Sequence, residues 1–212
     1  MSKMLVSICI AIALASTSYG VVIGNWEDGT LDGWTADPTA YIEIDSGVSN
    51  TLGNAATLGT NALLVAVDGG SYWALNFAPS TPINLAGQKL SLDITVLASD
   101  EVGWEDFGEK INVNSDGPSG YQEFAFDAAD SYNIADHSAT GHDWGSWTGD
   151  LQRHYVWDVS SYDDTGATWM SMWFSFQGWP ATAYIDNVQI TPEPATMALL
   201  GLGGLALIRR KK

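Results

Sequence analysis

The stretch WMSMWFSF at residues 169–176 decides the fold class. Methionine and phenylalanine occupy every even position from 170 to 176, whereas two tryptophans and two serines occupy the odd positions. Successive side chains of a strand point to opposite sides of a sheet, so a period of two indicates a strand with one buried and one outward face. The segment therefore predicts a half-buried β-strand.

The same signal recurs along the chain. Alternating segments and short apolar runs lie at residues 41–45, 63–67, 72–77, 90–96, 123–127, 155–159 and 184–190. Clusters of Gly, Asn, Asp and Ser separate them, and neither helical periodicity nor a linker stands out between residues 21 and 191. The sequence therefore predicts an all-β fold, an antiparallel β-sandwich made by one domain.

Charge is distributed unevenly. The formal net charge is −17 at pH 7, and residues 21–191 hold 24 of the 25 acidic residues but only three of the eight basic ones. A surface this negative repels the phosphates of nucleic acids and anionic lipids. We therefore expect neither of them as a partner of the main domain, and solubility is the simplest role of the charge.

The first 20 residues are typical of a secretory signal peptide. A short basic start precedes an apolar run, and the small residues Ser18 and Gly20 occupy positions −3 and −1 of a cleavage site before Val21. Cys9, the only cysteine, lies within this segment. The exported domain would therefore contain neither a thiol nor a disulfide.

The chain closes with TPEPATMALLGLGGLALIRRKK at residues 191–212. After Pro192-Glu193-Pro194, an uncharged apolar stretch at 195–208 precedes four basic residues. As a helix it would span roughly 21 Å, less than the ~30 Å hydrocarbon core of a bilayer. The basic end would remain on the cytoplasmic side. This pattern favours a temporary membrane anchor.

These three parts, in this order, resemble the PEP-CTERM sorting signal of Gram-negative bacteria. The resemblance implies export, tethering to the inner membrane by the tail, and removal of the tail by an exosortase near Pro192-Glu193-Pro194. It also implies a final place at the cell surface or in an extracellular matrix, together with exopolysaccharide. The expected organisation is a signal peptide at 1–20, a β-sandwich at 21–190 and the sorting signal at 191–212.

A second resemblance lies at the two ends of the main domain. NWEDGTLDGW at 25–34 and AYIDNVQI at 183–190 resemble the first and last strands of jelly-roll carbohydrate-binding modules. That family implies terminal strands lying side by side and a structural Ca²⁺ held by Glu27 and Asp186. Such an ion would add stability to a domain without thiols. The alternative is that the two carboxylates are solvated or cap turns.

Aromatic side chains provide the candidate ligand site. Trp169 and Trp173 share a strand face with serines, and Tyr155 and Trp157 alternate with His154, Val156 and Asp158. Flat rings among small polar residues can stack on sugar rings. We therefore predict that Tyr155, Trp157, Trp169 and Trp173 bind carbohydrate; the alternative is that these rings are ordinary core packing.

A polar, Gly-rich loop is expected at residues 137–150. It carries Trp144 and Trp147, which are further candidates for sugar contact. Their alternative role is to cover one end of the sandwich, because an exposed indole is costly without a partner.

Two weaker patterns involve acidic residues. Glu105, Asp106 and Glu109 lie close together, as a glycoside hydrolase would need, but such clusters arise by chance in an acidic chain. Residues 112–123 match the spacing of an EF-hand loop, yet strand-like segments flank them, so a hairpin is favoured. No nucleophile elbow, phosphate-binding loop or zinc-protease motif occurs in the sequence.

The sequence therefore predicts an exported, non-catalytic protein that associates with extracellular polysaccharide. A structural matrix protein that self-associates without binding sugar is the first alternative. A glycan-cleaving enzyme that uses Glu105 or Glu109 is the second.

Overall fold

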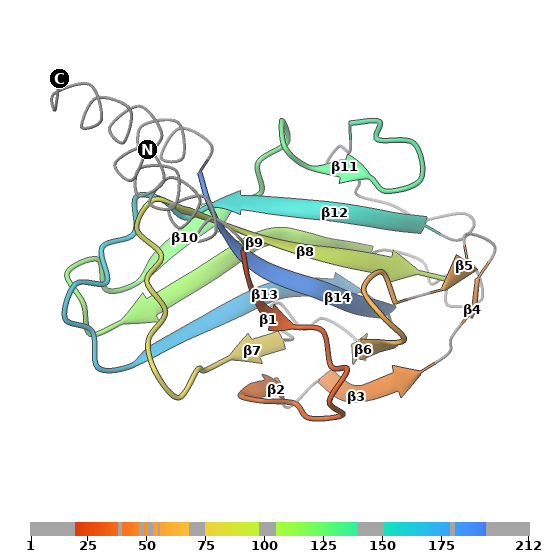
Figure 1. The fold of residues 1–212 in the computed structure, drawn as a ribbon, viewed down its shortest axis with the longest axis horizontal. Coiled ribbons are helices and arrows are strands. Elements are labelled where there is room, and N and C mark those ends of the chain that lie inside the picture. Colours follow the sequence, from red (N-terminus) through yellow and green to blue (C-terminus); the bar gives the residue numbers. More distant parts are fainter. Residues whose placement is uncertain are drawn as a thin grey trace, which may run out of the picture.

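The computed structural model describes residues 20–37, 40–46, 49–50, 53–54, 56–67, 75–97, 105–139, 151–178 and 181–193 (Figure 1). The predicted signal peptide and the apolar stretch at 195–208 lie outside these ranges. Within the described ranges every regular element is a strand, and no helix long and apolar enough to cross a membrane occurs there. The all-β prediction is confirmed.

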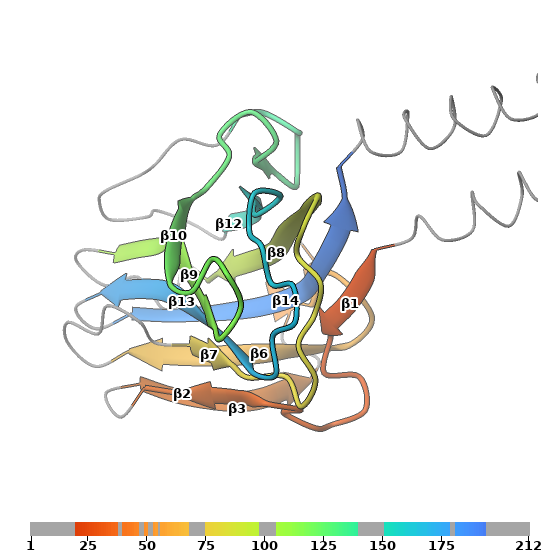
Figure 2. The ribbon, with the colours of Figure 1, turned by 90° about the vertical axis from the view of Figure 1, so that its left-hand side faces the viewer.

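The strands form two main antiparallel sheets, which Figure 2 shows as two layers. The seven-stranded sheet consists, in spatial order, of β11 (Tyr132–Asn133), β12 (Leu151–Asp158), β8 (Gln88–Val96), β14 (Ala181–Pro192), β6 (Asn61–Val67) and β3 (Ala40–Ser46), with β1 (Val21–Gly24) paired to β14.

The second layer is a five-stranded sheet. Its spatial order is β10 (Gln122–Ala125), β9 (Glu105–Ser115), β13 (Met170–Gly178), β7 (Leu75–Phe77) and β2 (Trp34–Ala36). A small hairpin pairs β4 (Ser49–Asn50) with β5 (Gly53–Asn54). The chain passes repeatedly from one main sheet to the other, so each sheet is assembled from strands distant in sequence.

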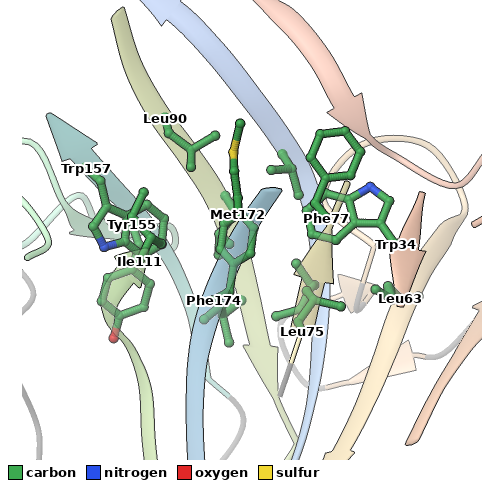
Figure 3. Close-up of a cluster of buried hydrophobic side chains, with 14 of the residues drawn as sticks. Trp34, Leu63, Leu75, Phe77, Leu90, Ile111, Tyr155, Trp157, Met172 and Phe174 are labelled. Carbon is green, nitrogen blue, oxygen red and sulfur yellow. The ribbon is translucent and has the colours of Figure 1, made fainter. Parts of the chain in front are cut away.

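The core fills the space between the two sheets and draws side chains from both (Figure 3). On β13 the predicted alternation holds from Met170 to Phe174, because Met170, Met172 and Phe174 are buried in this cluster. Ser175 is buried as well, where the register with β9 shifts. Trp173, on the opposite side of the strand, is only half-buried. Burial of the methionine and phenylalanine side chains thus fixes which face of the five-stranded sheet points outward.

On β12 the prediction was wrong. Tyr155 and Trp157 are core residues, with 3% and 0% of their surface exposed, and Figure 3 shows both in the buried cluster. The reason is the register with β8, which places them opposite Leu92 and Leu90 on the inward face. Neither ring is therefore available to stack on a sugar.

The two ends of the described chain meet, as the second resemblance implied. β1 pairs with β14, with Val21 opposite Ile190. The first strand, however, is 21–24 rather than 25–34. Residues 25–33 form a turn, in which Gly33 adopts a φ of 87° and follows a backbone path that favours glycine. Trp34 then enters the core, where its Nε1 donates to the Ile23 carbonyl over 3.0 Å.

The burial of Trp157 yields a stability prediction. Replacing it with alanine should lower the free energy of unfolding by about 3–5 kcal/mol, because the fully buried indole leaves a cavity. Urea unfolding of the Trp157→Ala and Trp169→Ala variants measures this. Trp169 is 47% exposed, so its loss should cost far less. Equal effects of the two substitutions would contradict the position of Trp157 in the core.

Candidate functional site

The outward face of the five-stranded sheet carries a continuous row of side chains centred on Trp173. Trp173 of β13 lies directly opposite Asn112 of β9 on one side and Asn76 of β7 on the other. Glu123 of β10 lies opposite Asn112, and Thr35 of β2 lies opposite Asn76. Residues directly opposite each other share a face and lie close together. We call these five residues the Trp173 row; across five strands it runs for roughly 19 Å.

Exposure differs along the Trp173 row. Thr35 and Glu123 at its ends are exposed, Trp173 and Asn76 are half-buried, and Asn112 is only 3% exposed. A partly exposed indole is therefore flanked by two side-chain amides in a half-desolvated setting. Hydrogen bonds formed there face less competition from water than at a fully exposed site.

Both amides retain an unused acceptor. The Oδ1 atoms of Asn76 and Asn112 are buried and have no hydrogen-bond partner. An unsatisfied buried polar atom costs on the order of 1–3 kcal/mol, and native proteins contain few of them. Because both oxygens are buried, a hydroxyl donor beside the Trp173 ring would reach them only after the amide side chains turn outward.

Tyr121 extends the same face at the β10 edge. It is 55% exposed, and its hydroxyl donates to Oε1 of Glu123 over 2.8 Å. Burial raises the pKa of Tyr121, and the hydrogen bond to Glu123 raises it further. The phenol therefore remains protonated at neutral pH and keeps the Glu123 carboxylate in place.

Trp169 is held just before β13 by Asp116. The Asp116 carboxylate accepts from the backbone N–H groups of Thr168, over 2.7 Å, and Trp169, over 3.2 Å. The hydrogen bond from the Thr168 hydroxyl is the main cause that lowers the pKa of Asp116. Asp116 lies in the link between β9 and β10, which pair as a hairpin. The hairpin interpretation of residues 112–123 is therefore confirmed.

Glu27, in the turn after β1, and Asp186, in β14, approach the same loop. Oε1 of Glu27 accepts from the N–H groups of Thr60 and Asn61, over 2.8 and 2.6 Å. Oδ2 of Asp186 accepts from the N–H groups of Thr57 and Leu58, also over 2.8 and 2.6 Å. The two carboxylates thus hold the segment that leads into β6, as the capping alternative predicted.

A calcium ion shared by the two carboxylates would compete with these hydrogen bonds. Ca²⁺ needs six to eight oxygen ligands, but all four carboxylate oxygens accept hydrogen bonds. Oε2 of Glu27 accepts from the Thr60 hydroxyl and Oδ1 of Asp186 from the Asn187 N–H. No group of three His, Cys, Asp or Glu side chains suited to a metal occurs in the part of the chain that the structure describes.

Asp186 also belongs to a buried polar network. Burial raises its pKa to about 6, although N–H groups donate to it, and the neighbouring Asp93 contributes in the same direction. Asp93 accepts from the Thr57 hydroxyl over 2.6 Å and from the Asn187 amide over 3.0 Å, and it lies 2.6 Å from Nδ1 of His154. Three central strands are thus linked on the side of the sheet opposite the core.

The predicted aromatic residues separate into two groups. Trp173 lies on the outward side of β13 and Trp169 is exposed just before this strand, whereas Trp144 and Trp147 lie outside the described residues. Asn76, Asn112 and Thr35 were missed as possible ligand contacts. The sequence does contain a pattern that could have identified them. Each is a polar residue between two apolar neighbours in its strand, and such a residue points away from the core.

Comparison with known proteins gives two findings. Residues 191–212 match the PEP-CTERM protein-sorting motif, so the predicted sorting signal is confirmed. No curated protein matches the chain. The family match thus covers the C-terminal 22 residues.

Several solved carbohydrate-binding modules are similar to the β-sandwich. One, specific for non-crystalline cellulose, is 15% identical, with a TM-score of 0.49 over 82% of this chain and 96% of that one. The xylan-binding domain of Xyn10C from Paenibacillus barcinonensis is 16% identical, with a TM-score of 0.48 over 82% and 96%. A third, from a study of the promiscuous specificity of β-sandwich carbohydrate-binding modules, is 14% identical, with a TM-score of 0.47. That match covers 82% of this chain but only 62% of that one.

The raised pKa of Asp186 predicts a pH dependence. A carboxyl that titrates near 6 when folded, against an ordinary value of 3.8, stabilises the fold below pH 3.8 and loses this contribution as the pH rises through 6. From pH 5 to pH 7 the loss should be about 1 kcal/mol, and it should vanish in Asp186→Asn. Urea unfolding at both pH values measures it.

Asp116→Asn is the matched control for this experiment. The pKa of Asp116 is lowered, so its own contribution changes only at more acidic pH, and the variant should keep the wild-type difference between pH 5 and pH 7. The same pH difference in the Asp186→Asn variant and the wild type would contradict the assignment to Asp186.

The hydrogen bonds to Glu27 and Asp186 also predict the effect of metal removal. Addition of a calcium chelator should leave the melting temperature of the protein unchanged within about 1 °C, because N–H groups already satisfy both carboxylates. Thermal unfolding with calcium, and with chelator, is the measurement. A drop of several degrees on chelation would show that a bound calcium ion stabilises the domain.

Proposed function

We propose that this protein is an exported, non-catalytic jelly-roll domain that binds extracellular polysaccharide on the Trp173 row. The observation that carries the proposal is the pair of buried, unpaired Oδ1 atoms on either side of a partly exposed indole. An aromatic ring with polar groups placed around it is the usual composition of a small-molecule or sugar site.

The indole supplies the apolar half of the contact. The C–H groups on one face of a pyranose ring can pack on the exposed surface of Trp173, while the hydroxyls around the ring edge meet the flanking side chains. Asn76 and Asn112 lie on either side of Trp173 across neighbouring strands. Successive sugar units of a chain could therefore follow the row across the sheet.

The charge of the site favours a neutral polysaccharide. The unpaired atoms are acceptors, Glu123 adds a carboxylate, and the chain carries a formal net charge of −17. Hydroxyl groups donate to such acceptors, whereas the carboxylates or sulfates of an acidic polymer would be repelled. Neutral hydroxyl-rich glycans are therefore the proposed ligand class.

The composition of the row supports binding without catalysis. Glycoside hydrolysis uses two carboxyl groups that flank the scissile bond, and the Trp173 row contains one, Glu123. Tyr121 hydrogen-bonds to this carboxylate, which suits a positioning role. Glu105 and Asp106, candidates for the enzymatic alternative, lie at the far end of β9, opposite Gly178 and Gln177.

The sorting motif at 191–212 supports the rest of the proposal. Its tail would hold the exported protein at the inner membrane of a Gram-negative bacterium until an exosortase removes it. The domain would then remain at the cell surface or in the matrix, where extracellular polysaccharide is the available partner.

Polysaccharide binding can be tested by affinity gel electrophoresis. With the full chain in a zwitterionic detergent, we expect retardation by at least one neutral polysaccharide and none by acidic ones. Trp173→Ala should weaken binding at least tenfold, because the ring provides the central contact.

Tyr41→Ala is the matched control, since Tyr41 is an exposed aromatic residue on the other sheet. It should bind as the wild type does, and circular dichroism should show that all variants are folded. Equal binding by Trp173→Ala and the wild type, or no binding to any glycan, would rule out the proposal.

A further inference from the structure

The sorting motif begins inside the last strand of the sandwich. The matched motif starts at Thr191, whereas β14 extends to Pro192. Thr191 and Pro192 lie opposite Lys89 and Gln88 of β8. The Glu193 N–H donates to the Gly87 carbonyl over 3.1 Å. The first three residues of the motif are therefore part of the folded domain.

The predicted signal-peptide junction lies beside this segment. Val21 of β1 is opposite Ile190, and a Cβ atom on Gly20 would lie 2.5 Å from Cγ2 of Thr191. Figure 2 shows β1 and the end of β14 side by side. The end of β14 is thus paired with β8 on one side and lies against the start of β1 on the other.

We propose that this pairing sets the position at which the sorting tail is cut: the folded sandwich withholds residues 191–193, and the cleaved bond lies beyond Glu193. This inference rests on the proposed processing of the motif. A peptidase binds its substrate as an extended chain with free backbone groups. The contacts of β14 and Glu193 with the β8 side extend through all three residues, so the bonds between them are shielded within the sheet.

The reaction is hydrolysis of a peptide bond. The C–N bond breaks, water supplies a hydroxyl to the carbonyl carbon, and its remaining proton goes to the amine of the released tail. The retained domain then starts at Val21 and ends at Glu193 or later. Because β1 and β14 keep their full pairing, processing on both sides leaves the sheet intact.

Shielding can be tested without the cellular enzyme. A proline-specific endopeptidase can cut the full chain after Pro192 and after Pro194. We expect cleavage after Pro192 to be at least tenfold slower than after Pro194 in the folded protein, and the two rates to become similar in urea. Mass spectrometry of the released peptides measures both. Equal rates in the folded protein would overturn the inference.

A spacer provides a matched pair of variants. Gly-Ser-Gly-Ser inserted between Thr191 and Pro192 should detach Pro192 from β8 and raise its cleavage to the rate after Pro194. The same spacer between Ser80 and Thr81, in the exposed link between β7 and β8, should leave Pro192 protected. Continued protection of Pro192 in the first variant would contradict the role of β8.

To find the cleaved bond, the protein is expressed in a host that has an exosortase and in the same host without one. The terminal peptides of the mature protein, identified by mass spectrometry, should begin at Val21 and end at Glu193 or beyond. A mature protein that ends at Pro192 or earlier would overturn this inference but not the proposed processing. An unchanged chain in both hosts overturns the proposed processing together with it.

Discussion

Burial of the apolar side of β13 is the constraint on which the candidate site depends. Met170, Met172 and Phe174 are inside the sandwich. Because successive side chains of a strand point to opposite faces, Trp173 lies on the outward side. A shift of one residue in register would place the methionines in water and the indole in the core. The same register sets Asn76 and Asn112 beside the ring, so the stability of the fold and the geometry of the site come from one pattern.

That pattern could be predicted on β13 but not on β12, and the difference is instructive. β13 has one strongly apolar side, so its phase follows from its own sequence. β12 carries large side chains on both sides, and only the pairing of Tyr155 and Trp157 with Leu92 and Leu90 decides which side is buried. Such pairing joins residues distant along the chain, so a local pattern cannot reveal it. The importance of Asn76 and Asn112 was hidden for the same reason, because each amide matters only beside Trp173.

Two converging carboxylates, such as Glu27 and Asp186, can be stabilised either by a cation or by backbone N–H groups. Glu27 and Asp186 converge, as the sequence resemblance implied, but on backbone N–H groups of residues 57–61. These N–H groups present partial positive charge to the carboxylates, which is the role a cation would otherwise have. For exposed Glu27 this lowers the pKa, whereas for Asp186 burial outweighs the same kind of hydrogen bond and raises it.

The topology separates the export signals from the candidate binding face. β1 and β14 belong to the seven-stranded sheet, whereas the Trp173 row lies on the outward side of the other sheet. The core of the sandwich therefore lies between the strands that lead to the tail and the surface proposed to meet polysaccharide. A glycan on the row would contact neither the end of β14 nor its partners in β8. The proposed binding of polymer and the proposed removal of the tail would therefore involve separate sheets of the sandwich, and the core between them sets that separation.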